Sequence, residues 1–169
     1  MLRTDSKMTK LVFIGGAPGV GKSTVCSEIL NRTENAVWLD GDDLWRMQPF
    51  VVNESTKAMV ERNIQFVLRS FLKGGFAYVF FTWVLHDQAI IKRLLEALDG
   101  EQFQFLMFTL VCDGQTLSAR LAQDPGRTTD KELALERLRQ TELLDTVKID
   151  TFGMEPEEVA GEIIQSLIA

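Results

Sequence analysis

The sequence lacks a long apolar run, an excess of positive charge and a set of cysteines, and each absence excludes a class of protein. Without a long uninterrupted apolar stretch there is no candidate membrane span. With 24 acidic and 18 basic residues the net charge is −6, so the chain has no long-range attraction for nucleic acid or for an anionic bilayer. We therefore expect neither nucleic acid nor a membrane among its partners, with a local basic pocket as the open alternative.

Thiols are few, and Cys26 and Cys112 are the two that the chain carries. They lie far apart, one in a helical pattern and one at the end of a predicted strand, which is typical of reduced thiols in a cytoplasmic protein. A disulfide is not needed, because a globular chain of this length buries roughly 70% of its unfolded surface. With 46% hydrophobic and 25% charged residues, general disorder is excluded. The length predicts a single domain over positions 1–169.

Strand-like and helix-like segments alternate along the chain. The run at 76–83, FAYVFFTW, is nearly all apolar, as a central strand of a parallel sheet should be. Short apolar runs predict strands at 10–15, 36–40, 76–83, 102–111 and 146–150. Amphipathic spacing and turn signals predict a helical turn at 43–47 and helices at 21–31, 54–73, 87–98, 116–123, 131–144 and 156–169. This alternation predicts an α/β domain with a mostly parallel sheet.

A glycine-rich loop follows the first predicted strand. Positions 16–23 fit G-x-x-x-x-G-K-[ST] and are followed by Thr24; they are Gly16, Ala17, Pro18, Gly19, Val20, Gly21, Lys22 and Ser23. Glycines let successive backbone N–H groups point at phosphate oxygens, and the following helix adds its positive N-terminus. In this pattern Lys22 reaches the β- and γ-phosphates, and the Ser23 hydroxyl binds Mg²⁺. Because an apolar strand precedes the loop and a helix follows it, the motif predicts a site for ATP and Mg²⁺ rather than an ordinary glycine turn.

On this loop and its context, the chain resembles the small P-loop kinases, a group that includes gluconate and shikimate kinases, chloramphenicol phosphotransferase and the nucleoside monophosphate kinases. The resemblance spans the chain from the loop to the last helix. It implies a three-layer P-loop NTPase fold, with helices on both faces of a five-stranded parallel sheet in the order 2-3-1-4-5. It also implies an acceptor-binding segment at about 41–73 and a short arginine-bearing lid at about 124–131.

Three aspartates follow the second predicted strand, at the edge where open α/β sheets bind ligands. The pair Asp40 and Asp42 looks like the D-x-D pair of gluconate and shikimate kinases. That resemblance implies that Asp40 belongs to the Mg²⁺ shell and that Asp42 accepts or orients the proton of an acceptor hydroxyl. The alternative is helix capping by Asp42 or Asp43, and we expect Asp43 to be the cap. The third strand usually supplies a metal-shell acid in P-loop proteins, but 80–83 contains none, which shifts that role toward Asp40.

Arginines near the predicted lid form a second group of candidates. The resemblance implies that Arg120 stacks on adenine, that Arg127 closes on the γ-phosphate, and that Arg137 binds the nucleotide after the lid. A planar guanidinium suits stacking on a flat ring in a way that lysine does not. For each arginine the alternative is a solvated charge on a helix, and we expect Arg139 to face solvent. The catalytic candidates are Lys22, Asp42 and Arg127.

Aromatic residues and the one histidine follow the acidic cluster and the third strand. We expect Trp45, Trp83 and His86 to face the sheet edge that holds the phosphate loop. Both tryptophans could equally belong to the core, since large aromatic side chains mostly pack. His86 is near a predicted helix N-terminus, which should lower its pKa. It is therefore either a neutral hydrogen-bonding group at the site or an ordinary surface or capping residue.

These features predict an ATP-dependent phosphotransferase that moves the γ-phosphoryl group of MgATP to a small-molecule acceptor, with the chain as a monomer or homodimer. A hydroxyl acceptor is favoured, because a monophosphate needs arginines to neutralise it, and the stretch 82–87 carries Asp87 and no arginine. Arg46, Arg62 or Arg69 could supply that charge, so a nucleoside monophosphate kinase is the first alternative. A nucleotide-binding ATPase or switch is the second. The sequence leaves open the acceptor and the choice between ATP and GTP.

Overall fold

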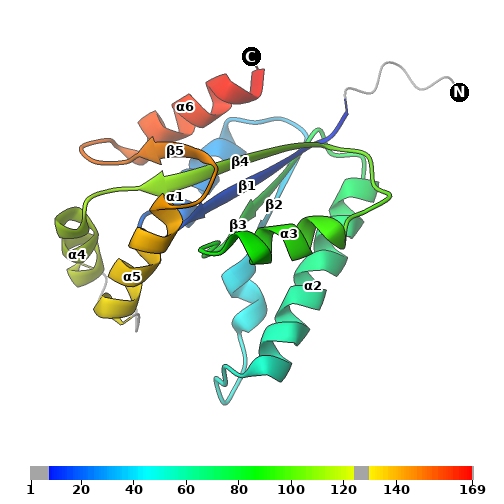
Figure 1. The fold of residues 1–169 in the computed structure, drawn as a ribbon. Coiled ribbons are helices and arrows are strands. Elements are labelled where there is room, and N and C mark those ends of the chain that lie inside the picture. Colours follow the sequence, from blue (N-terminus) through cyan, green and yellow to red (C-terminus); the bar gives the residue numbers. More distant parts are fainter. Residues whose placement is uncertain (1–7, 124–129, 169) are drawn as a thin grey trace, which may run out of the picture.

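The computed structural model describes residues 8–123 and 130–168 and contains a five-stranded parallel sheet (Figure 1). Its strands lie in the order β2-β3-β1-β4-β5, which confirms the order implied by the resemblance to the P-loop NTPase fold. The strands are β1 (Lys10–Gly16), β2 (Ala36–Asp40), β3 (Tyr78–Thr82), β4 (Gln104–Val111) and β5 (Val147–Asp150).

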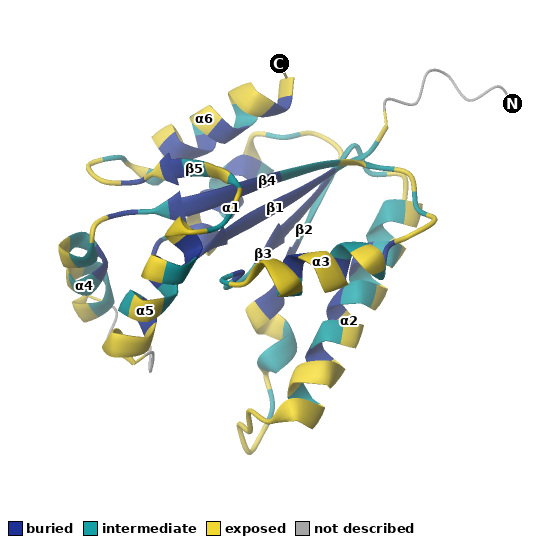
Figure 2. Cartoon of the chain, in the orientation of Figure 1, coloured by how far each residue is buried: buried dark blue, intermediate teal, exposed yellow. Residues whose placement is uncertain are grey.

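Helices cover both faces of the sheet and divide the core in two. They are α1 (Lys22–Asn31), α2 (Glu54–Lys73), α3 (Gln88–Glu96), α4 (Gly114–Ala122), α5 (Lys131–Glu142) and α6 (Pro156–Ile168), with a short 3-10 helix, η1 (Gly41–Trp45). Successive residues of a strand point to opposite faces. Val12 and Ile14 of β1 therefore pack with residues of α1, α5 and α6, whereas Leu11 and Phe13 pack with residues of α2 and α3. Figure 2 shows that the buried residues lie along the strands and on the helix sides that cover them.

Most predicted boundaries lie within a few residues of the observed ones. α4 begins earlier than predicted, because the Asp113 carboxylate accepts hydrogen bonds from two N–H groups of its first turn, both at 2.9 Å. α2 begins where predicted, because Asn53 and Thr56 form a reciprocal capping box. Within the described residues, no helix combines the length and the apolar character that crossing a bilayer requires.

The carboxyl ends of β1, β2 and β3 meet at one edge of the sheet, since neighbouring parallel strands end on the same side. There β1 leads through the glycine-rich loop into α1, β2 leads into η1, and β3 leads through residues 83–87 into α3 (Figure 1). Open α/β sheets bind their ligands at this edge. The fold therefore brings together three segments that are distant in the sequence and that contain most of the predicted site residues.

Candidate active site

The loop between β1 and α1 passes so close to neighbouring segments that its backbone requires glycine. A Cβ on Gly16, whose φ is +142°, would lie 2.7 Å from the carbonyl oxygen of Leu110. One on Gly19, whose φ is +85°, would lie 2.6 Å from a methyl carbon of Leu121. Gly21 precedes α1 and provides no side-chain cap. The partial positive charge of the helix N-terminus therefore faces the loop, as an anion-binding site requires.

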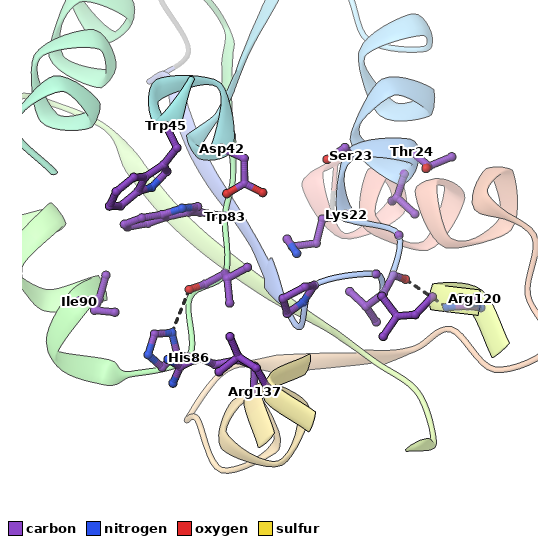
Figure 3. A pocket seen from close by; sticks show the side chains of 18 of the residues that line it. Lys22, Ser23, Thr24, Asp42, Trp45, Trp83, His86, Ile90, Arg120 and Arg137 are labelled. Atoms are coloured by element: carbon purple, nitrogen blue, oxygen red, sulfur yellow. Dashed lines mark hydrogen bonds between the residues drawn. The ribbon is translucent and has the colours of Figure 1, made fainter. Parts of the chain in front are cut away.

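Lys22 begins α1, and only 7% of its surface is exposed. Its Nζ donates a 2.9 Å hydrogen bond to the carbonyl oxygen of Ala17, so the ammonium group is held against the phosphate loop. Figure 3 shows this group pointing into the space between the loop and Asp42. The loop motif predicts the β- and γ-phosphates of a nucleotide at this place.

Ser23 and Asp40, the two predicted metal ligands, contact each other directly. Ser23 Oγ donates to Asp40 Oδ2 at 2.6 Å, and Asp40 Oδ1 accepts from the N–H of Asp42 at 3.1 Å. Asp40 thus ends β2, caps η1 and touches the phosphate loop. The prediction that Asp43 is the cap is wrong, since its carboxylate instead accepts two hydrogen bonds from Arg46, at 3.0 and 2.7 Å.

The donor set at this point fits Mg²⁺. A hydroxyl and a carboxylate side by side are hard oxygen ligands, and Mg²⁺ is usually bound through one or two carboxylates, substrate phosphates and several waters. A larger cluster is not needed, and among the described residues no group of three or more histidines, cysteines, aspartates or glutamates could hold a metal ion. Thr82 of β3 lies opposite Asp40 in the sheet, but it is buried and accepts a 2.9 Å hydrogen bond from Trp38 Nε1. It therefore does not replace the acid that β3 lacks.

A cavity of about 1780 Å³ extends from the phosphate loop in two directions. Lys22 lies between its two sides in Figure 3. Pockets for one drug-sized ligand usually measure about 300–1,000 Å³, so this cavity has room for a nucleotide and a second small molecule. The side near α4 and α6 is lined by Arg120, Thr151 and Met154, and the side near α2 and α3 by Asp42, Trp45, Trp83 and His86.

Arg120 connects the phosphate loop to the segment that follows β5. Its Nη1 donates to the carbonyl oxygen of Val20 at 3.1 Å and to Thr151 Oγ1 at 2.9 Å, and its Nη2 donates to the carbonyl oxygen of Thr151 at 2.9 Å. These three bonds hold the guanidinium plane in one orientation at the cavity wall. Arg120 was predicted from the sequence as a site residue and Thr151 was not, although a polar residue directly after the fifth strand must lie at the same edge of the sheet.

His86 and Arg137 lie near each other at the cavity (Figure 3). His86 Nδ1 is 3.1 Å from the carbonyl oxygen of Val84, and Arg137 Nη1 donates to Gln140 Oε1 at 2.6 Å. Burial lowers the pKa of His86, and the charge of Arg137 lowers it further, while the contact with Val84 opposes the shift. The predicted fall in this pKa is confirmed, although burial and not a helix N-terminus is its main cause. Arg127 and most of the predicted lid lie outside the described residues.

Trp45 and Trp83 both line the cavity and both pack against the part of the core under α2 and α3. Gly41 makes room for Trp83, because a Cβ at this position would lie 2.7 Å from the indole ring. The ring of Phe50 is 6.1 Å from that of Trp45, and Phe50 is 65% exposed. The two tryptophans therefore belong both to the core and to the cavity wall. We call Trp45, Phe50 and Trp83 the aromatic surface of the cavity.

An ion pair between two helices lines the same side of the cavity. Arg93 of α3 donates two hydrogen bonds to the carboxylate of Glu61 of α2, at 3.1 and 2.7 Å. This pair was not predicted from the sequence, because only the fold brings the two helices together. Arg69, one of the candidates for neutralising an acceptor phosphate, instead pairs with Glu101 at 3.6 Å, beyond the end of α3.

The fold and the glycine-rich loop define the class of the protein, a P-loop NTPase domain. The AAA domain family matches residues 12–145, and the chain belongs to this family. No curated protein is similar to the chain in sequence.

Solved structures with the same fold include a resistance protein and two kinases. The tunicamycin resistance protein of Deinococcus radiodurans is 19% identical, with a TM-score of 0.68 over 94% of this chain and 95% of that chain. A gluconokinase from Sinorhizobium meliloti 1021 is 17% identical, with a TM-score of 0.71 over 96% and 93%. Shikimate kinase from Acinetobacter baumannii, in complex with shikimate, is 16% identical, with a TM-score of 0.66 over 96% and 94%. At these identities the similarity establishes the fold alone.

Proposed function

We propose that the chain is an ATP-dependent phosphotransferase that moves the γ-phosphoryl group of MgATP to a hydroxyl group of a small molecule. The observation that carries the proposal is one cavity that contains the phosphate loop and, beyond Lys22, the exposed carboxylate of Asp42. A transfer enzyme needs both substrates in contact, whereas a nucleotide switch has no use for a second compartment. The named activities of two similar structures, a gluconokinase and a shikimate kinase, agree with this proposal.

The residues of the phosphate loop and of the end of β2 have distinct roles in this proposal. The loop amides and Lys22 bind the triphosphate, and Ser23 and Asp40 hold Mg²⁺ through their side-chain oxygens. When bound, this ion neutralises charge on the β- and γ-phosphates. Lys22 stabilises the charge that develops during transfer. Asp42 accepts the proton that the acceptor hydroxyl loses as the phosphoryl group arrives.

Arginines support the nucleotide in this proposal. The base lies beside Arg120, whose guanidinium plane is fixed by its bonds to Val20 and Thr151. Arg137 donates to a neutral amide oxygen rather than to a carboxylate, so its charge is suited to the phosphates. Arg127, outside the described residues, is proposed as a lid arginine on the resemblance alone.

Charges on the acceptor side favour a hydroxyl group over a nucleoside monophosphate. A phosphate dianion requires basic groups that can turn to it, but Arg93 is bound to Glu61 through two hydrogen bonds. Asp87 keeps a carboxylate at the cavity, where it caps α3 by accepting from the N–H of Ala89 at 2.8 Å. These carboxylates would repel a second phosphate, whereas an alcohol has no charge to repel.

The test measures ADP release with MgATP in the presence and absence of a panel of hydroxyl compounds, with mass spectrometry of the products. We expect at least one compound to stimulate ADP release and to gain one HPO₃ group. Equal ADP release with and without every compound would support the ATPase or switch instead. Turnover of a nucleoside monophosphate with kcat/KM above about 10⁴ M⁻¹s⁻¹, the lower end of the usual enzyme range, would support the monophosphate kinase.

A further inference from the structure

Basic groups on the acceptor side of the cavity are already paired with acids. This side is formed by η1, α2, α3 and the segments that precede the two longer helices, and it carries three described lysine or arginine residues. An exposed ion pair is weak and can open, but opening it costs the contact with the partner. Each of the three contacts a carboxylate: Arg46 with Asp43 at 2.7 Å, Lys57 with Glu54 at 3.0 Å and Arg93 with Glu61 at 2.7 Å.

Two further carboxylates make this side acidic. Asp42 and Asp87 both line the cavity beside Glu54 and Glu61 of the ion pairs, whereas Asp43, the partner of Arg46, is not among the lining residues. His86 adds no positive charge at neutral pH, because its burial favours the neutral ring. Arg137 lies near His86 and donates to the neutral Gln140 amide, and the proposed function assigns its charge to the triphosphate. A carboxylate or phosphate on the acceptor would therefore meet like charge, and would have to displace an acid from any of the three paired bases that it approached.

The aromatic surface offers a different kind of contact. Phe50 is 65% exposed at the cavity, beside the partly buried Trp45. Aromatic faces bind flat apolar groups by stacking, and they attract cations through the ring quadrupole. In Figure 3 the indoles of Trp45 and Trp83 lie on the same side of the cavity as the carboxylate of Asp42. A molecule stacked on this surface would thus have its hydroxyl group near the proposed base.

From these contacts we infer that the acceptor is an uncharged or cationic alcohol with a flat, apolar part, and that sugar acids are excluded. This inference rests on the proposed function, because it concerns the acceptor of the same transfer. It separates the chain from the similar gluconokinase and shikimate kinase, since gluconate and shikimate are both carboxylic acids. Similar folds would then carry acceptor sites of opposite charge preference.

Three small alcohols test the charge preference directly. 1-Phenyl-1,2-ethanediol, 2-amino-1-phenylethanol and mandelate share a phenyl carbinol and differ in one group, which is neutral, cationic or anionic. Their binding to the chain with a non-hydrolysable MgATP analogue is measured by ligand-observed NMR titration. We expect the diol and the amino alcohol to bind at least about tenfold more tightly than mandelate, because like charges in a cavity are strongly unfavourable. Equal or tighter binding of mandelate overturns the inference.

Two matched pairs of variants identify the groups responsible. Phe50→Ala should weaken binding of the diol about threefold or more through lost stacking, whereas Phe66→Ala, which removes a ring that is 75% exposed outside the cavity, should not. Glu61→Gln should tighten mandelate binding about threefold by releasing Arg93 from an ion pair. Glu162→Gln makes the same change in net charge on α6, away from the cavity, and should have no effect. Equal effects within either pair overturn the assigned contact.

Failure of the inference and failure of the proposed function give different results. Efficient phosphorylation of gluconate or shikimate would overturn the inference and leave the proposed transfer intact. Preferential binding of the diol and the amino alcohol, without transfer to any hydroxyl compound, would support the preference of this surface and overturn the proposed function.

Discussion

Ser23 Oγ lies 2.6 Å from Asp40 Oδ2, so the phosphate loop and the end of β2 share a hydrogen bond. The neighbouring strand β3 offers Thr82 in register with Asp40, and the Thr82 hydroxyl is already bound to Trp38. The protein ligands proposed for Mg²⁺ are therefore two adjacent side chains from two different segments. Loss of either one should weaken metal binding without disturbing the sheet.

Asp40→Asn should raise the Mg²⁺ concentration needed for half-maximal transfer by about tenfold, because a neutral amide oxygen is a weaker ligand for a hard cation than a carboxylate. The measurement is a Mg²⁺ titration of the initial rate at saturating ATP. Asp43→Asn is the matched control, since it removes a nearby carboxylate that pairs with the exposed Arg46. Identical Mg²⁺ dependence in Asp40→Asn and the wild type would remove Asp40 from the metal shell.

Lys22→Ala should reduce the rate of phosphoryl transfer about 10²–10³-fold, as expected for the loss of a preorganised charge at the reacting group. The fold should persist, because the Lys22 ammonium contacts the Ala17 carbonyl of the loop and is not part of the apolar core. Rates at saturating acceptor are compared with thermal unfolding curves of the same samples. A variant that folds and retains near-wild-type turnover would show that this loop does not support transfer.

Asp42→Asn should lower transfer to the acceptor by about two to four orders of magnitude, the range for removal of a general base. The affinity for ATP should change little, because Asp42 lies on the acceptor side of Lys22. Calorimetric titration of an ATP analogue and the transfer rate separate the two effects. Weakened ATP binding together with normal turnover would mean that the roles given to Asp40 and Asp42 are exchanged or wrong.

The sheet order could be predicted because the phosphate loop and its context give the chain its resemblance to the small P-loop kinases, which implies that order. The sheet edge that carries the predicted site residues could be predicted because neighbouring parallel strands end on the same side. The phosphate loop after an apolar strand fixes the fold class, and parallel strands bring Asp40 and residue 83 to the same edge. The cap of η1 was predicted wrongly, because capping depends on the backbone direction at the end of β2. Asp40 Oδ1, and not the Asp43 carboxylate, accepts the hydrogen bond from the N–H of Asp42 there.

Contacts between side chains of different elements could not be predicted from the sequence. The bond between Arg120 and Thr151 joins residues 31 positions apart, and that between Glu61 and Arg93 joins residues 32 positions apart. No local spacing rule covers such distances, since each depends on how two helices or loops pack. The first contact fixes the orientation of the Arg120 guanidinium at the cavity wall. The second pairs the positive charge of Arg93 with the carboxylate of Glu61.

Arg120→Lys should raise the KM for ATP about tenfold and leave kcat nearly unchanged, because lysine cannot reproduce three fixed bonds in one plane. Thr151→Val removes the threonine hydroxyl that accepts a 2.9 Å hydrogen bond from Arg120, and it should raise the KM for ATP by a smaller factor. Arg139→Lys on the exposed face of α5 is the control. Measurements of kcat and KM across ATP concentrations decide this point. An effect on kcat alone would place Arg120 with the transferring phosphoryl group instead.

The stability of the protein should decrease as the pH falls below about 6.5, the ordinary pKa of histidine. His86 is the one histidine of the chain, and burial, followed by the charge of Arg137, lowers its pKa in the folded protein. Because the unfolded chain then binds the proton more readily, His86 contributes its full stability above the unfolded pKa. That contribution is lost as the pH falls toward the folded pKa.

His86→Gln removes this titration and keeps a polar side chain near Val84. Wild type and variant are compared by thermal unfolding between pH 7.5 and 5.5, a range in which ordinary carboxylates, with pKa values near 4, remain ionised. We expect the melting temperature of the wild type to fall toward pH 5.5 and that of the variant to change less. Parallel curves would show that protonation of His86 costs the fold nothing. The ring would then have to reach solvent in its charged form, away from Arg137 and the cavity.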